Sequence, residues 1–351
     1  MRIGVPRERK PLEGRVALVP EACAHLVALG HEVWVERRAG KASGYPDDAY
    51  EAAGVRLAED PAGVYGSARL IVKVKEPVAD ELELLRPDHL LFCFLHLAAL
   101  PELEDALCRI GLTAVAFETV QKGGLLPLLA PMSEIAGRLS VQIGAHLLHR
   151  PQGGRGLLLG GITGAPRGRV VVLGCGSAGM AAAQMAVDMG SEVVAFDLNR
   201  ERLASVRPLG TGVTALFPYA DAVREAVAAA DIVIGAVLVP GARAPRVVDA
   251  PMVRSMPAGS VVVDVSVDQG GCVETTRPTT YDDPTYLVYD VIHFSVTNMP
   301  GAVPRTASQA LSAVLTPYVE RLAADDWESV PALAEAINVR DGRPVLDTLR
   351  G

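Results

Sequence analysis

The 351-residue sequence lacks a long apolar run, an excess of positive charge and any clustering of cysteine. The longest apolar stretch, His89 to Leu100, is too short to cross a bilayer, and the N-terminus continues into a predicted strand rather than a signal sequence. A formal net charge of −8 argues against nucleic acid as a partner. The five cysteines have no metal-ligand spacing, which predicts reduced, mostly buried thiols and no metal site. We therefore expect a cytoplasmic protein without a membrane partner.

Repeats and low-complexity tracts are also missing, and the 34 glycines and 25 prolines are spread along the chain. Their distribution excludes collagen-like and disordered classes. With 50% hydrophobic residues, the chain is a globular protein longer than one ordinary core requires, so two domains are expected.

Apolar runs alternate with helical patterns from the first residue. The runs RIGVP, EVWVE, LIVKVKEP, LLFCFLHL and TAVAFETV are apolar at consecutive positions, which predicts parallel strands covered on both faces. A long helix with Ser133 as its predicted N-cap follows, and then a second series: RVVVLG, EVVAFDLN, DIVIGAVL and SVVVDVSVD. A last helix, at 306–324, is expected to return to the first domain.

This order predicts an α/β protein with two doubly wound parallel-sheet (Rossmann-like) domains and a cleft between them. Residues 1–130 plus 306–351 would form a discontinuous substrate domain, and 131–305 a Rossmann NAD-binding domain.

The second series contains a dinucleotide-binding motif, Gly174-Cys175-Gly176-Ser177-Ala178-Gly179, which follows VVVL directly and opens a helix. Glycines at these positions allow a tight turn, approach of the backbone to a pyrophosphate, and close helix–strand packing. Asp197 ends the next strand, where a carboxylate binds a ribose diol and repels a 2′-phosphate. NAD is therefore favoured over NADP, although Arg202 could soften that preference or be only a solvated surface charge.

Two of only five lysines, Lys73 and Lys75, occupy alternate positions of the apolar run LIVKVKEP. The period of a strand would place both side chains on one face, and Pro77 stops the strand just after Lys75. A buried ammonium is costly unless it meets an anion, and open α/β sheets bind ligands at strand carboxyl ends. We expect Lys75 to meet a substrate anion, the alternative being an ion pair with Glu76 or another carboxylate. A structural ion pair is the favoured role for Lys73.

His96 ends the following strand in the same way. A lone histidine there is more often a packed core residue, but its position beside Lys75 favours a catalytic imidazole. His89, at the opposite end of the run, is expected to be structural.

Three loops supply the remaining candidates. Arg15 follows the first strand and abuts VALVP, where an arginine can clamp a carboxylate. Asp268 lies just past the strand VVVD, while Asp264 on that strand is expected to be structural. The loop with Asn298 and Met299 could contact nicotinamide, the alternative for both later loops being turn chemistry.

These residues lie within segments that resemble the alanine dehydrogenases of the alanine dehydrogenase/transhydrogenase group. The matching segments run in order from residue 1 to about 320: RIGVPRERK, EGRVALVP, IVKVKEP, FLHLA, FETV, PLLAPMSEIAGR, GAVLVPGARAP, VDVSVDQGGC, RPTTYDDPTY and NMPGAVPRT. The resemblance implies a substrate domain split between the chain's two ends, a homohexamer, and interconversion of L-alanine and pyruvate with NAD.

The resemblance also implies roles for individual residues. Arg15 and Lys75 would hold the carboxylate and keto oxygen of the substrate, with Met132 beside the pocket, while His96 and Asp268 handle protons at the reacting carbon. The implied cofactor contacts are Ser133, Gly174, Gly176, Ser177, Ala178, Gly179, Asp197, Arg202, Val237, Leu238, Asn298 and Met299.

Two other functions remain open from the sequence. One is the soluble nucleotide-binding module of a proton-translocating transhydrogenase, which has no need of a buried lysine and histidine in the first domain. The other is a related dehydrogenase for a larger amino acid, because pocket volume cannot be derived from a sequence.

Overall fold

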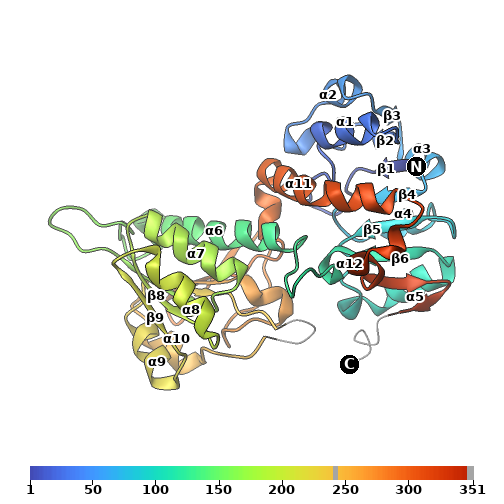
Figure 1. Ribbon diagram of the computed structural model, residues 1–351. Helices are drawn as coiled ribbons and strands as arrows, with labels where there is room; N and C mark the ends of the chain where they lie inside the picture. Colours follow the sequence, from blue (N-terminus) through green and yellow to red (C-terminus); the bar gives the residue numbers. More distant parts are fainter. Residues whose placement is uncertain (240–243, 346–351) are drawn as a thin grey trace. The chain divides into compact units, whose positions relative to one another are not determined.

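The computed structural model describes residues 1–239 and 244–345, which fold into two compact units (Figure 1). Unit 1 is Met1–Met132 together with the chain from Pro300 onward, and unit 2 is Ser133–Met299. Residues 240–243 of the GAVLVPGARAP segment and residues 346–351 of the expected substrate domain lie outside the described residues.

Unit 1 is built on a sheet whose order, within the described residues, is β15-β14-β6-β5-β4-β1-β2-β3. The pairs from β6 through β3 are parallel, whereas β14 is antiparallel to β6 and to β15. The chain leaves β1 in one direction to build β2 and β3 and later returns to β4 on its other side, so the switch point lies between β1 and β4. The strands are β1 (Arg2–Val5), β2 (Glu32–Glu36), β3 (Arg56–Ala58), β4 (Leu70–Val72), β5 (Leu90–Cys93), β6 (Thr113–Ala116), β14 (Ile337–Arg340) and β15 (Arg343–Pro344).

The helices of unit 1 lie in the connections between the strands of this sheet (Figure 1). Tyr65, Leu103 and Leu107 of the helices α3 and α5 pack with Ile71 and Leu91 of the sheet in one buried apolar cluster. The helices are α1 (Pro20–Ala28), α2 (Asp47–Ala52), α3 (Pro61–Ser67), α4 (Ala79–Leu82), α5 (Pro101–Ile110), α11 (Pro304–Leu322) and α12 (Pro331–Ala334), with 3₁₀ turns η1 (Lys41–Ser43), η2 (Leu97–Ala99), η3 (Phe117–Thr119) and η8 (Trp327–Ser329).

Unit 2 repeats the plan with the strand order β12-β13-β11-β10-β7-β8-β9 in its described residues. All pairs are parallel except the β12–β13 hairpin, and the switch point lies between β7 and β10. The strands are β7 (Arg169–Leu173), β8 (Glu192–Phe196), β9 (Val213–Leu216), β10 (Ile232–Gly235), β11 (Val261–Asp264), β12 (Thr285–Val288) and β13 (Val291–Phe294).

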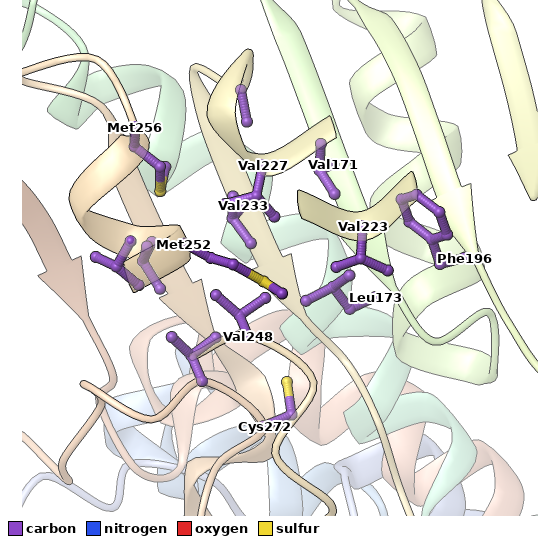
Figure 2. Close-up of a cluster of buried hydrophobic side chains, with 14 of the residues drawn as sticks. Val171, Leu173, Phe196, Val223, Val227, Val233, Val248, Met252, Met256 and Cys272 are labelled. Carbon is purple, nitrogen blue, oxygen red and sulfur yellow. The ribbon is translucent and has the colours of Figure 1, made fainter. Parts of the chain in front are cut away.

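The helices of unit 2 lie on its sheet, and Figure 2 shows the core beneath two of them. Val223 and Val227 of α9 and Met252 of α10 pack on Val171 and Val233 of the sheet. Burial of such side chains is worth about 1.5–3 kcal/mol each, which makes this apolar layer the main support of the unit. The helices are α6 (Ala130–Leu147), α7 (Ser177–Asp188), α8 (Arg200–Val206), α9 (Ala220–Ala228) and α10 (Ala250–Ser255).

The prediction of two Rossmann-like α/β domains is confirmed, and the sheets add antiparallel edges that the sequence did not predict. Two local predictions are wrong. Helix α6 begins at Ala130, so Ser133 lies inside its first turns rather than at its N-cap, because Pro131 is well tolerated in a first turn. Strand β4 ends at Val72, before Lys73 and Lys75, so the period of a strand does not govern the two lysines.

In the described part of the chain, no helix is long and apolar enough to cross a membrane. All five cysteines are free, and all but Cys108 are buried, as predicted.

Candidate active site

The glycine motif lies at the switch point of unit 2, in the turn from β7 to α7. Gly174 has a φ of +88° and donates its N–H to the carbonyl of Phe196, and Gly176 is the N-cap of α7. The N–H groups of the first turn of a helix have no partner within the helix and carry the positive end of its dipole. The turn therefore offers hydrogen-bond donors to a phosphate group.

The space around the three glycines fits a dinucleotide. A Cβ on Gly179 would lie 1.7 Å from the carbonyl oxygen of Gly174, so only glycine permits this contact between α7 and the turn. A Cβ on Gly174 would lie 2.6 Å from the carbonyl oxygen of Ala236, in the chain that leaves β10. Gly176 instead faces open space, with only an Arg202 nitrogen near a Cβ, at 3.9 Å. The turn is tight where it meets protein and open where a pyrophosphate would lie.

Asp197 stands at the end of β8 and is only 8% exposed. Its carboxylate accepts the N–H of Cys175 at 2.6 Å and that of Asn199 at 2.7 Å, which joins it to the glycine turn. Arg202 of α8 lies 3.7 Å from the same carboxylate, with a half-exposed side chain. Asp197 and Arg202 are thus brought together beside the turn.

Other predicted cofactor contacts surround the same edge of the unit 2 sheet. Val237 and Leu238 lie just past β10, after Ala236, and Leu238 is 48% exposed. Ser133 lies one turn before Gly137 on α6, where a Cβ on Gly137 would lie 2.0 Å from the carbonyl oxygen of Ala178. Since positions four apart share a helix face, Ser133 lies on the face of α6 that meets the start of α7.

The loop after β11 carries Asp268, and Asp264 organises it. Asp264 is fully buried, and its carboxylate accepts the N–H of Ser266 at 2.9 Å, the N–H of Cys272 at 3.0 Å and the hydroxyl of Thr276 at 2.7 Å. Burial raises the pKa of Asp264 against the opposing effect of these hydrogen bonds. These hydrogen bonds agree with the predicted structural role of Asp264, because they join the residues before and after the exposed Asp268.

The loop with Asn298 and Met299 is the last segment of unit 2 along the chain. Asn298 has a φ of +59°, which asparagine tolerates better than most residues. The hydroxyl of Tyr281 donates to the carbonyl of Met299 at 2.9 Å, and the Met299 side chain is 2% exposed.

In unit 1, Arg15 and Lys75 follow β1 and β4, the two strands that flank the switch point. Arg15 is 3% exposed and holds its guanidinium against the Glu13 carboxylate, with Nε at 2.7 Å from Oε1. The Nη1 of Arg15 lies 3.2 Å from the sulfur of Met132, which places these two predicted substrate contacts together. Burial, followed by the positive charge of Arg15, lowers the pKa of Lys75. The charges of Glu76 and Glu13 oppose this effect.

Lys73 differs from Lys75 in its surroundings. It is 1% exposed, and its Nζ lies 3.3 Å from a Glu8 oxygen and 3.1 Å from a Glu81 oxygen. Burial opposes the charge of Lys73, but the two carboxylates outweigh it and raise its pKa. The favoured structural role of Lys73 agrees with this ion pair. Glu8 also accepts the N–H of Val74 at 2.6 Å and that of Lys75 at 3.3 Å, so the network fixes the backbone at Lys75.

His96 lies three residues beyond the end of β5, and its side chain is exposed. Its ring stacks on that of Phe94, with centroids 5.8 Å apart and planes at 4°. Burial alone would raise the pKa of Glu76, the residue that follows Lys75, but the hydrogen bond and the charge of Lys10 prevail and lower it. By contrast, His89 is 1% exposed and hydrogen-bonded at both ring nitrogens, as expected of a structural residue.

Sequence reasoning missed the carboxylates that hold these candidates, Glu8, Glu13 and Glu118. Glu8 and Glu13 lie in the charged loop RERKPLEGR, where their residue type gives no signal, and Glu118 lies on the 3₁₀ turn that follows β6. Among the described residues, no group of three histidines, cysteines or carboxylates is arranged to hold a metal ion.

Comparison with known proteins places this geometry in a family. The model for the N-terminal domain of alanine dehydrogenase/PNT matches residues 4–136, and the model for its C-terminal domain matches residues 140–346. The chain is 47% identical to an alanine dehydrogenase of Bacillus subtilis, covering all of this chain and 92% of that protein. It is 46% identical to an alanine dehydrogenase of Mycobacterium tuberculosis, with 97% of this chain and 94% of that protein covered.

Solved structures agree. An L-alanine dehydrogenase structure is 50% identical, covers 100% of this chain and 98% of its own, and superimposes with a TM-score of 0.96. A transhydrogenase structure from Sinorhizobium meliloti is 28% identical over 99% of both chains, with a TM-score of 0.87. The chain therefore belongs to the alanine dehydrogenase/PNT family.

Proposed function

We propose that the protein is an NAD-dependent L-alanine dehydrogenase, which oxidises L-alanine with water to pyruvate and ammonium and also catalyses the reverse reductive amination. The observation that carries this proposal is the pair of cations in unit 1, the buried Arg15 and the partly buried Lys75, on the two strands that flank the switch point of its sheet. A 2-oxo or 2-amino acid offers a carboxylate and a neighbouring oxygen or nitrogen, which such a pair can bind and orient.

Unit 2 would hold the dinucleotide. The pyrophosphate would accept hydrogen bonds from the turn at Gly174–Gly179, and the Asp197 carboxylate would bind the adenosine ribose. The bound nicotinamide supplies the hydride acceptor. Asp197 favours NAD because its negative charge repels a 2′-phosphate.

Unit 1 would supply the substrate contacts. The Arg15 guanidinium, oriented by Glu13, would bind the substrate carboxylate, and the Lys75 ammonium would polarise the keto oxygen. Met132, which contacts Arg15, would line the pocket next to the methyl group.

We assign proton transfer to His96 and Asp268 on the resemblance to the family. In the reductive direction ammonia adds to pyruvate, the former keto oxygen is protonated and leaves as water, and the resulting iminium carbon accepts the hydride; imidazole titrates in the range that suits a proton donor for the departing oxygen near neutral pH. Interconversion of the imine and the ketone passes through a carbinolamine, whose nitrogen and oxygen exchange protons with these two side chains.

We further propose a cytoplasmic homohexamer, on the resemblance to the family. Leu158 and Ile162, which precede β7, are 58% and 68% exposed and supply apolar surface that association would cover. Light scattering on purified protein gives the mass that tests the hexamer.

A nucleotide-binding module of a transhydrogenase is the second candidate, supported by the likeness to the S. meliloti structure. It requires no amino-acid site, so the buried Arg15–Glu13 pair and its neighbour Lys75 favour the dehydrogenase.

The test is NADH absorbance with purified protein, NAD+ and L-alanine at alkaline pH, with other amino acids and NADP+ in parallel. We expect NADH to form with alanine and NAD+. Lys75→Ala and His96→Ala should lose activity while retaining NADH binding. Tight NADH binding without turnover of any amino acid would instead favour the transhydrogenase-like function.

A further inference from the structure

The backbone at His96 adopts a conformation that is uncommon for a residue with a side chain. Its φ of 52° and ψ of 35° lie in the left-handed region, which is normally occupied by glycine. A residue with a side chain stays there only where the surroundings hold it, and such residues are concentrated at functional sites. Something other than local preference must therefore fix His96.

One carboxylate holds the backbone at this position. Glu118 lies on the 3₁₀ turn η3, at the end of β6, which pairs with the strand that leads to His96. Its Oε1 accepts the N–H of His96 at 2.6 Å and the N–H of Leu95 at 3.1 Å. Hydrogen bonds from two successive N–H groups to one charged acceptor are stronger than neutral ones and define the local direction of the chain.

The turn that carries Glu118 is itself anchored. The hydroxyl of Thr119 lies 3.1 and 3.2 Å from the carbonyl oxygens of Ala116 and Ala336, which share its one proton, and accepts from the side chain of Asn338 at 2.9 Å. Ala336 and Asn338 come from the C-terminal part of unit 1, so η3 is fixed from two directions. Glu118 therefore acts from a rigid support.

The same turn also restrains the ring of His96. Phe117 is fully buried and meets Phe94 edge to face, with centroids 5.0 Å apart at 75°. Phe94 in turn lies parallel to the His96 ring. Backbone and ring are thus both held from η3, one through Glu118 and the other through Phe117 and Phe94.

We propose that Glu118 is a positioning residue for the reaction: its carboxylate holds His96 in the left-handed conformation from which the imidazole transfers its proton. This inference rests on the proposed function of His96. Among residues 1–239 and 244–345, the side-chain hydrogen bonds of Glu118 come from the backbone N–H groups of Leu95 and His96, and Glu118 is not assigned to the substrate, so it acts through His96.

The first test compares Glu118→Ala and Glu118→Gln with Glu102→Ala, which removes an exposed carboxylate from the neighbouring helix α5. Misplacement of a catalytic group by about 1 Å costs about 100-fold in rate, so we expect kcat of Glu118→Ala to fall about 10- to 100-fold. The KM for alanine and the NADH affinity should stay near wild type. Glutamine keeps one acceptor oxygen and should retain more activity, which makes it the informative variant if the alanine variant does not fold.

A double-mutant cycle separates positioning from general structural support. In a His96→Ala background, adding Glu118→Ala should lower the residual rate by no more than about twofold, because Glu118 then has nothing to position. The same loss in both backgrounds, or wild-type kcat in both Glu118 variants, would overturn the proposal.

Hydrogen exchange keeps this inference distinct from the proposed function. The Leu95 and His96 amides should exchange faster in Glu118→Ala, with no change in Glu102→Ala, whether or not alanine is the substrate. An inactive wild-type enzyme would refute the alanine assignment. Unchanged exchange at these two amides would refute the role of Glu118.

Discussion

Replacement of Lys73 by methionine should strongly destabilise unit 1, because it leaves two carboxylates buried without their cation. Lys73, Glu8 and Glu81 have side chains that are at most 2% exposed, with contacts of 3.3 and 3.1 Å. At an effective dielectric constant of about 20, each pair attracts by about 5 kcal/mol, and the cost of desolvation offsets part of this. We expect a net loss of about 3–5 kcal/mol in the free energy of unfolding at neutral pH.

The pH dependence provides the sharper test. Burial already raises the pKa of Glu8, and Lys73 supplies the largest opposing effect, so the variant raises that pKa further. A carboxyl group with a raised pKa binds its proton more tightly in the folded state, so its contribution to stability is full below the unfolded pKa, about 4.3, and is lost as the pH rises through the folded pKa. The deficit of Lys73→Met should therefore narrow as the pH falls from neutral toward that value.

Guanidinium unfolding of wild type, Lys73→Met and the control Lys41→Met over a pH series measures both effects. Lys41 is exposed, so its replacement should change the free energy of unfolding by less than about 0.5 kcal/mol. Adding Glu8→Gln to Lys73→Met should restore part of the loss at neutral pH. A Lys73→Met protein within about 1 kcal/mol of wild type, or a deficit that grows on acidification, would refute the reasoning.

Three further predictions follow from the two sites. Gly179→Ala places a Cβ 1.7 Å from a carbonyl oxygen and should weaken NADH binding about 100-fold, or about 2.7 kcal/mol, by calorimetry, whereas Gly66→Ala, which meets nothing within 4 Å, should bind normally. Because the pKa of Lys75 is lowered, the KM for pyruvate should rise with pH before the ordinary lysine value of about 10.4, and Lys75→Arg should abolish that rise in steady-state assays. Asp264→Asn replaces one of two acceptor oxygens by an NH₂ group that faces other donors, and should lower the free energy of unfolding by about 1–3 kcal/mol, measured by thermal unfolding. The kcat should fall as well, because the loop with the proposed catalytic Asp268 loses its support.

The central strands could be predicted because their apolar runs admit few other structures. Strands such as β7 and β10 are buried on both faces, which the unbroken runs of valine and isoleucine indicate. The short β3 and β9 are partly exposed, and three or four residues carry too little periodicity to identify a strand. The antiparallel pairing of β14 with β6 joins segments more than 200 residues apart, and no local pattern encodes it.

The candidate site shows the same division between local and distant information. Lys75 and His96 could be selected because a charged or titratable side chain at the end of an apolar run is an anomaly that requires an explanation. Glu8 and Glu118, by contrast, are acids in polar or ordinary surroundings, and they lie 67 and 22 residues from the backbone groups that they hold. Their role becomes apparent only in the folded chain, where their carboxylates accept the backbone N–H groups of Lys75 and His96. Polar groups that face a ligand can thus be identified in the sequence, whereas the groups that fix their geometry can be identified only in the folded chain. Variants of these supporting groups, such as Glu118, therefore best distinguish a site that is merely present from one that is correctly positioned.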